Sequence, residues 1–140
     1  MSVSGGGAFV AGWNLGFVGF DGRIGVQLNN LIGIYAQPYF MLGYGERGDF
    51  KAFTGFAGAA AMVDFTFLDR FFAGAGAGGA ILNNPGAGEL HIRIGGYPLL
   101  GRGFDPARRK GLMVGVDMRV YFASGFQIVN VMGGVGYEAF

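Results

Sequence analysis

Hydrophobic and polar side chains alternate along most of this chain with a period of two residues. Residues 112–122 show the pattern most clearly, because every second side chain is large and apolar. The apolar series is Leu112, Val114, Val116, Met118, Val120 and Phe122. Successive side chains of a β-strand point to opposite faces, so this stretch predicts a strand with one apolar face.

Seven other segments repeat the alternation. Residues 89–95 place an apolar series opposite a charged one, with Leu90, Ile92 and Ile94 facing away from Glu89, His91 and Arg93. The remaining predicted strands are residues 9–18, 23–29, 32–44, 57–67, 71–82 and 129–138. Helical periodicity fails in these segments, because a glycine inside a helix costs about 1 kcal/mol and glycines interrupt every candidate stripe.

Turn-forming residues separate the predicted strands. Asp21-Gly22 is a strong hairpin signal and predicts that the first two strands form a hairpin around it. Pro38 lies in the apolar series of its segment and has no backbone N–H, which predicts a local irregularity in the sheet. The other predicted connections are Asn29-Asn30, residues 46–51, Leu68-Asp69, residues 83–88, residues 100–110 and Ser124-Gly125.

Eight strands of this kind predict a closed sheet. An even number of antiparallel strands is what a closed bacterial barrel requires, and most segments are near the length that crosses a bilayer. The expected fold is therefore all-β: an eight-stranded antiparallel up-and-down transmembrane β-barrel. The expected organisation is a single β-barrel domain over residues 1–140, with residues 1–7 as a flexible leading segment.

Composition indicates that something other than water covers part of the surface. The chain is 51% hydrophobic, 16% aromatic and only 14% charged, against about 25% charged in ordinary soluble proteins. It has no run of about 18 apolar residues that would predict a transmembrane helix. A closed barrel is the spanning alternative.

The charged residues inside the predicted strands all lie on the face opposite the apolar series. This segregation is expected of a lipid-facing barrel, because an Arg or Lys at mid-bilayer costs about 2 to 4 kcal/mol. The predicted luminal polar network is Arg23, Asp64, Glu89, His91, Arg93, Asp117 and Arg119, and Glu138 shares its face. The network would fill the lumen with salt bridges, or it would line a conduit and select ions.

A soluble eight-stranded barrel would show the same alternation with inside and outside exchanged. The distribution of large and small side chains between the two faces favours the membrane barrel. The apolar series carries Phe, Trp, Leu, Ile and Val, whereas the opposite series is rich in glycine, which suits a cramped interior. A soluble β-barrel that binds a hydrophobic ligand stays open as the alternative.

In this pattern the chain resembles the small eight-stranded outer-membrane barrels of Gram-negative bacteria, over almost its whole length. Its C-terminal residues 135–140 are similar to the terminal-Phe signal of that family, with Tyr137 and Phe140 as the candidate assembly signal. The resemblance implies an outer-membrane location, membrane lipid as a partner, and recognition by the barrel assembly machinery. The N-terminus has no signal-peptide pattern, so we expect a mature form carrying an initiating Met, or a designed sequence.

Candidate chemistry is sparse. One outer-membrane barrel family with lipid-hydrolysing activity uses a His with a Ser and an acid. The only histidine here is His91, and the serines Ser2, Ser4 and Ser124 fall in the leading segment or a turn. We therefore predict no catalytic site and a hydrogen-bonding role for His91, with a lipid-modifying barrel enzyme as a less favoured alternative.

Other functional classes find no support in the sequence. The absence of cysteine excludes disulfides and thiolate zinc sites, and the glycine run at residues 74–79 lacks the Lys-Ser or Lys-Thr of a phosphate loop. We expect no metal and no cofactor. A net charge of +1 gives no basic stripe for nucleic acid. The predicted function is a non-enzymatic outer-membrane barrel, structural or forming a very narrow, porin-like pore with a charged lumen.

Overall fold

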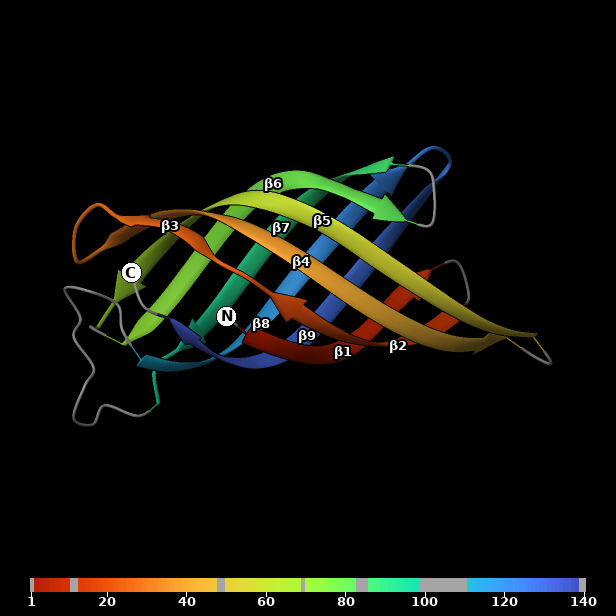
Figure 1. Cartoon of the computed structure of the whole chain (residues 1–140), viewed down its shortest axis with the longest axis horizontal. Helices are drawn as coiled ribbons and strands as arrows, with labels where there is room; N and C mark the ends of the chain where they lie inside the picture. The colour runs from red at the N-terminus through yellow and green to blue at the C-terminus, as the bar shows by residue number, and fades with distance from the viewer. Residues whose placement is uncertain are drawn as a thin grey trace.

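Nine antiparallel β-strands form a closed ring in the computed structural model, which describes residues 2–10, 13–47, 50–68, 70–82, 86–98 and 111–138 (Figure 1). Their bounds are β1 Ser2–Val10, β2 Trp13–Asp21, β3 Ile24–Gln27, β4 Ile32–Arg47, β5 Phe50–Phe67, β6 Phe71–Leu82, β7 Gly86–Gly96, β8 Gly111–Ala123 and β9 Phe126–Glu138. Apart from β2 and β3, strands that follow one another along the chain pair with each other. β1 also pairs with β9, and the pairing of β2 with β4 closes the ring. The described part of the chain contains no helix long and apolar enough to cross a membrane.

The strands β2 and β3 act as one strand of the ring. Both pair with β4 in one continuous register, with Asp21 opposite Tyr39 and Ile24 opposite Ala36. The ring therefore has eight strand positions, and the predicted eight-stranded antiparallel up-and-down barrel is confirmed. The hairpin predicted at Asp21-Gly22 is wrong, because the chain runs straight through that pair.

The interruption between β2 and β3 lies opposite Pro38. The Gly22 N–H donates to the Pro38 carbonyl oxygen at 2.9 Å. A paired residue would return an N–H to Gly22, and proline has none. The irregularity predicted from Pro38 is therefore confirmed, although it breaks the strand opposite Pro38.

The first hairpin lies elsewhere than the sequence predicted. β1 pairs with β2 from Ser2 opposite Asp21 to Val10 opposite Trp13, so the hairpin joins Val10 to Trp13. Residues 2–7 belong to β1, which corrects the expected flexible leading segment. For the strand expected at residues 9–18, the bulky series with Trp13, Leu15 and Phe17 was predicted to face lipid, and that prediction is wrong. Phe17 is buried, whereas Val18 and Phe20 are more than 60% exposed on the outer face.

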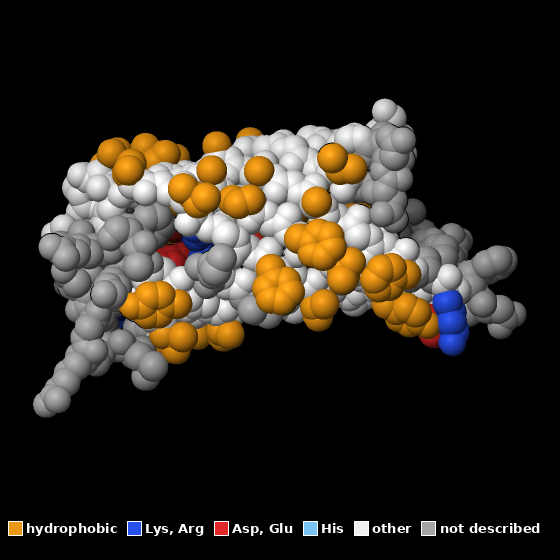
Figure 2. All heavy atoms as spheres, viewed as in Figure 1, with side chains coloured by type: hydrophobic (Ala, Val, Ile, Leu, Met, Phe, Trp, Pro, Cys, Tyr) orange, Lys and Arg blue, Asp and Glu red, His pale blue; other side chains and the backbone are white. Residues whose placement is uncertain are grey.

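Elsewhere the predicted faces hold. In β7 the burial of successive residues alternates strictly, and Leu90, Ile92 and Ile94 lie outside. In β8 the predicted apolar series lies on the outer side, with Val120 half-buried. Figure 2 shows apolar side chains spread over the outer face of the barrel. The exterior is therefore the apolar surface, as the membrane interpretation requires and the soluble interpretation does not.

Glycine makes room for large side chains in the interior. Asp64 lies opposite Gly74, Tyr39 opposite Gly58 and Phe17 opposite Gly43 on neighbouring strands. A Cβ on any of these glycines would overlap the partner side chain. This pairing of a large residue with glycine explains why a narrow barrel can hold aromatic and charged side chains.

Two predicted turns have the geometry their residues favour. The Asn29 side-chain oxygen accepts hydrogen bonds from the N–H groups of Leu31 and Ile32, both at 2.8 Å. Gly125, between β8 and β9, has a φ of 88°, in the left-handed region that favours glycine. The predicted loop at residues 46–51 is shorter than expected, since β4 continues to Arg47 and β5 begins at Phe50. The longest predicted connection, residues 100–110, lies outside the described residues.

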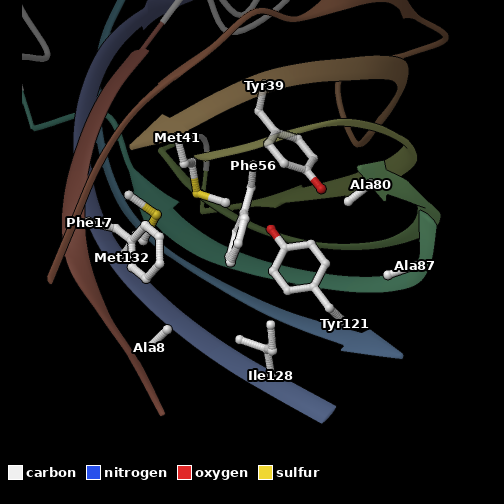
Figure 3. Close-up of a cluster of buried hydrophobic side chains, with 10 residues drawn as sticks. All are labelled: Ala8, Phe17, Tyr39, Met41, Phe56, Ala80, Ala87, Tyr121, Ile128 and Met132. Carbon is white, nitrogen blue, oxygen red and sulfur yellow. The ribbon is translucent and has the colours of Figure 1, made fainter. Parts of the chain in front are cut away.

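An apolar cluster fills the interior toward the end opposite the chain termini (Figure 3). Its members are Ala8, Phe17, Tyr39, Met41, Phe56, Ala80, Ala87, Tyr121, Ile128 and Met132. The Phe56 ring centre lies 5.1 Å from that of Phe17 and 5.6 Å from that of Tyr121. Toward the other end Phe72, Tyr97 and Met113 form a smaller buried cluster.

Candidate functional site

Most charged side chains of the described strands gather in the interior of the barrel, between the two apolar clusters. Six of the seven residues in the predicted luminal network are buried, and the side chain of the seventh, Arg23, is only 3% exposed. Three buried residues outside that prediction, Asp21, Gln37 and Glu138, lie with them. Alternation along the strands explains the arrangement, since one face of every strand points inward.

Arg93 on β7 is the hub of one half of the network. Its Nη1 donates to the Tyr35 hydroxyl at 2.8 Å and lies 3.3 Å from Asp64 Oδ2. Its Nη2 donates to Glu138 Oε1 at 3.2 Å. The guanidinium carbon lies 4.1 Å from the centre of the Phe72 ring. These partners come from β4, β5, β6 and β9, so one side chain ties five strands together.

Arg119 on β8 is the hub of the other half. Its Nη2 donates to Asp21 on β2 and, at 3.3 Å, to Asp117 Oδ2 on its own strand. Its Nε lies 3.9 Å from Glu89 Oε1, and its guanidinium covers the Tyr39 ring at 4.1 Å. Because β4 lies four positions from β8 in a ring of eight, Arg119 reaches the opposite wall of the barrel.

Arg23 joins the interrupted strand β2–β3 to β9. Its Nη1 contacts Glu138 Oε1 at 2.5 Å, and its Nε donates to Gln37 Oε1 at 3.3 Å. Glu138 thus accepts from both Arg23 and Arg93, and the Tyr97 hydroxyl donates to its other oxygen. This carboxylate is the junction between the last strand and the rest of the interior.

His91 lies between the two halves of the network and is fully buried. Its Nδ1 is 3.7 Å from Glu89 Oε1, and its Nε2 is 3.5 Å from Asp117 Oδ2. Neither ring nitrogen makes a hydrogen bond within the described residues. The Ser–His arrangement of a lipid-hydrolysing site is therefore not formed around this ring, which faces carboxylates in the lumen.

Among the described interior residues, carboxylates outnumber guanidinium groups. The carboxylates are Asp21, Asp64, Glu89, Asp117 and Glu138, and the guanidinium groups are Arg23, Arg93 and Arg119. The described residues contain no cluster of three or more metal-ligating side chains suited to a metal ion. Direct pairing of opposite charges is therefore the chemistry that this arrangement provides.

Sequence reasoning missed Asp21, Gln37 and the interior tyrosines Tyr35 and Tyr39. Asp21 was assigned to a turn, although alternation from Arg23 would have placed it on the same face. Tyr35, Gln37 and Tyr39 lie on the polar side of their segment, so their position was predictable but their hydrogen bonds were not. The Tyr39 hydroxyl donates to Glu89 at 2.5 Å across the lumen.

The structure describes only one of the two residues of the candidate assembly signal. Tyr137 lies on the outer face with half of its surface exposed. Phe140 lies outside the described residues.

Comparison with known proteins supports the fold and leaves the sequence family open. No protein family model matches the chain, and no curated protein matches it in sequence. The fold is similar to the crystal structure of the outer membrane enzyme PagL, with a TM-score of 0.62 at 16% identity, covering 96% of this chain and 97% of that one. The KdgM porin covers 99% of this chain and all of its own at 8% identity, with a TM-score of 0.39.

The likeness to PagL corrects one expectation. The sequence predicted that the chain is not an enzyme, because the expected barrel has few candidate catalytic groups. That prediction is wrong, because an outer membrane enzyme has this fold. At 16% identity the likeness establishes the fold and does not identify a reaction.

Proposed function

We propose that this chain is an integral β-barrel of a bacterial outer membrane. We further propose that it has a structural role and conducts no ions, because charged side chains fill its interior. The apolar exterior supports a lipid environment. Large apolar side chains such as Ile24, Phe65 and Ile94 are more than half exposed there. The charged residues in the middle of the strands point inward, and the exposed pair of Glu46 and Lys51 lies at the far end of β4 and the start of β5. In water such a surface would favour aggregation.

The proposal that the barrel is closed rests on the side chains that fill its interior from wall to wall. Arg119 reaches from β8 to Tyr39 on the opposite wall, and both Arg119 and Arg93 are only 1% exposed. The interior of an eight-stranded barrel is just wide enough for side chains. A conduit would need space between these groups, so the structural role is favoured over the narrow pore.

Conductance in planar bilayers tests whether the barrel is closed. We expect the unchanged protein to give no conductance steps. A double variant, Phe56→Ala with Arg119→Ala, removes bulk from the apolar cluster and from the charged network, and we expect it to conduct. The matched control, Val116→Ala with Met118→Ala, removes side chains that face outward, and it should stay silent. Regular steps from the unchanged protein would contradict the proposal.

Refolding with and without lipid tests the membrane location separately. We expect a β-type circular dichroism spectrum and heat-modifiable gel migration only in detergent micelles or thin-bilayer vesicles. A monodisperse β-protein in plain buffer would instead support a soluble carrier.

The assembly signal is part of the same proposal. The outward position of Tyr137 supports a role in contacts made before the barrel closes. We expect Tyr137→Ala to lower the yield of folded barrel in vesicles that contain the barrel assembly machinery. The same substitution should leave folding in detergent unchanged, since half of the Tyr137 surface lies exposed on the outer face.

A further inference from the structure

His91 is a buried titratable group that the proposed structural role does not use. Its ring points into the lumen from β7 and is 0% exposed. The ring nitrogen Nδ1 faces Glu89 Oε1 at 3.7 Å, and Nε2 faces Asp117 Oδ2 at 3.5 Å. Each nitrogen of the ring therefore has a carboxylate oxygen in front of it.

Charged groups of both signs surround this ring. Arg93 is two residues away on β7, and Arg119 lies directly opposite His91 on β8. On its other side, β6 presents only Gly76 at this level. The other titratable groups of the described interior are Asp21 and Arg23 at the ends of β2 and β3, Tyr35 and Tyr39 on β4, Asp64 on β5, Tyr97 after β7, Tyr121 on β8 and Glu138 on β9.

The two neighbouring guanidinium groups are bonded mainly to other carboxylates. Arg119 donates to carboxylates on β2 and β8, and Arg93 pairs with carboxylates on β5 and β9. Glu89 Oε1 keeps only longer contacts, 3.7 Å to the His91 ring and 3.9 Å to Arg119 Nε. Within the described residues it accepts no hydrogen bond. The imidazole is therefore the nearest group that can supply this oxygen with a donor.

The two protonation states of the ring differ in how they fit this site. A neutral imidazole donates from one nitrogen and only accepts at the other, whereas an imidazolium donates from both. In the neutral state one accepting nitrogen of His91 would face the carboxylate oxygen of Glu89 or Asp117. The ring is closed to solvent, so water cannot separate the two acceptors. The imidazolium is the form that matches both neighbours.

The charge of the interior favours the same state. Five carboxylates and three guanidinium groups lie in the described interior, which leaves two negative charges in excess when the ring is neutral. Buried charge without a partner is costly. A proton on His91 removes one of the two excess charges at the place where Glu89 lacks a donor.

We propose that His91 is an imidazolium at neutral pH and acts as the fourth cation of the interior, bridging Glu89 to Asp117. An exposed histidine titrates near about pH 6.5, so the unfolded chain mostly lacks this proton at pH 7.5. The native barrel then binds one proton more than the unfolded chain. Its stability therefore falls as the pH rises through the range in which the buried ring loses that proton.

Nitrogen NMR on the unchanged protein tests the charge state directly. The chain has a single histidine, so ¹⁵N-histidine labelling of the full chain, without a histidine tag, reports on His91 alone. In detergent micelles at pH 7.5 we expect both ring nitrogens to carry a proton and to have similar ¹⁵N shifts. In the urea-unfolded chain at the same pH we expect the two well-separated shifts of a neutral ring.

Three charge-removing variants locate the groups that hold the proton. Glu89→Gln and Asp117→Asn each keep the shape of one neighbour and remove its charge. We expect either variant to lower the pH at which the folded ring loses its second proton by about 1 pH unit or more. Glu46→Gln removes the same charge from an exposed position at the far end of β4, and it should leave that pH unchanged.

The pH dependence of unfolding tests the consequence for the barrel. We expect the urea midpoint of the unchanged protein in micelles to fall between pH 6 and pH 8.5. His91→Gln keeps a side chain that can donate one hydrogen bond but cannot titrate. Its urea midpoint should therefore change less over this range.

Two results would overturn the proposal. One is a folded ring with a single protonated nitrogen at pH 7.5, which would assign any additional proton to a carboxyl group. The other is the same pH dependence of unfolding in the unchanged protein and in His91→Gln. The NMR result needs no variant, so it decides the question even where a substitution prevents folding. Neither measurement involves conductance, so this inference and the proposed closed barrel can fail independently.

Discussion

The Arg119 guanidinium lies over the Tyr39 ring, with its central carbon 4.1 Å from the ring centre, although the two residues are on opposite walls of the barrel. The Tyr39 hydroxyl donates to Glu89, and the Arg119 Nε lies 3.9 Å from the same carboxylate. Three strands are thus joined by three buried side chains. A desolvated cation over an aromatic ring contributes about 2 kcal/mol, and the carboxylate adds charge pairing.

Removal of Arg119 is therefore expected to destabilise the barrel. Arg119→Ala removes the guanidinium partner of Asp21 in a buried site and leaves Asp117 only the longer contact with Arg93 Nε, at 3.9 Å. Breaking a buried pair in this way costs about 3–5 kcal/mol. Urea unfolding in micelles, followed by tryptophan fluorescence, measures the change. The neighbouring outward substitution Met118→Ala serves as the control, and equal stability of the two variants would show that the network does not hold the walls together.

The glycines of β6 offer a second test, on the packing of the interior. A Cβ on Gly74 would overlap the Asp64 carboxylate, whereas a Cβ on the outward Gly79 would come no nearer than 3.5 Å to the Ala87 carbonyl oxygen. Overpacking costs about 1–3 kcal/mol. We expect Gly74→Ala to lower the free energy of unfolding by that amount and Gly79→Ala to leave it nearly unchanged. The reverse order would mean that the interior has spare room at Asp64.

The second half of the barrel was predictable because charges fix which face of each strand points inward. β7 carries Glu89, His91 and Arg93, and β8 carries Asp117 and Arg119, all with one parity. Only one assignment keeps these groups away from lipid. The alternation therefore had a single physically acceptable interpretation.

The first strands lack that constraint, and there the prediction failed. Residues 1–20 contain no charged side chain. Both the series with Phe17 and the series with Val18 are apolar, so periodicity alone could not choose between them. Asp21-Gly22 then resembled a hairpin, and only the pairing with Pro38 shows that the strand continues. The contacts of Arg119 across the lumen could not be predicted either, since they depend on which strands face each other in the ring.

The outer face can be tested with a single charge. Ile92 lies near the middle of β7 on the exposed face, and Leu112 lies near the beginning of β8 on the same face. An arginine costs about 2–4 kcal/mol at mid-bilayer and about 0–1 kcal/mol near the interface. We expect Ile92→Arg to reduce the folded fraction in thin-bilayer vesicles much more than Leu112→Arg. Equal effects would contradict the assigned depth of the two positions.

Pro38 tests why β2 and β3 are separate. Pro38→Ala supplies the N–H that can return a hydrogen bond to the Gly22 carbonyl, so we expect the interruption at Gly22 and Arg23 to close. The gain in stability should be small, because a hydrogen bond contributes about 0.5–1.5 kcal/mol and loss of proline restores about 0.4–1 kcal/mol of unfolded-chain entropy. Hydrogen exchange is the sharper measurement: the new amide at position 38 should be protected. Gly22→Ala, whose Cβ would make ordinary contact with Pro38 at 3.4 Å, is the control and should leave the interruption in place. An unprotected amide at position 38 would mean that something other than the missing donor keeps the two strands apart.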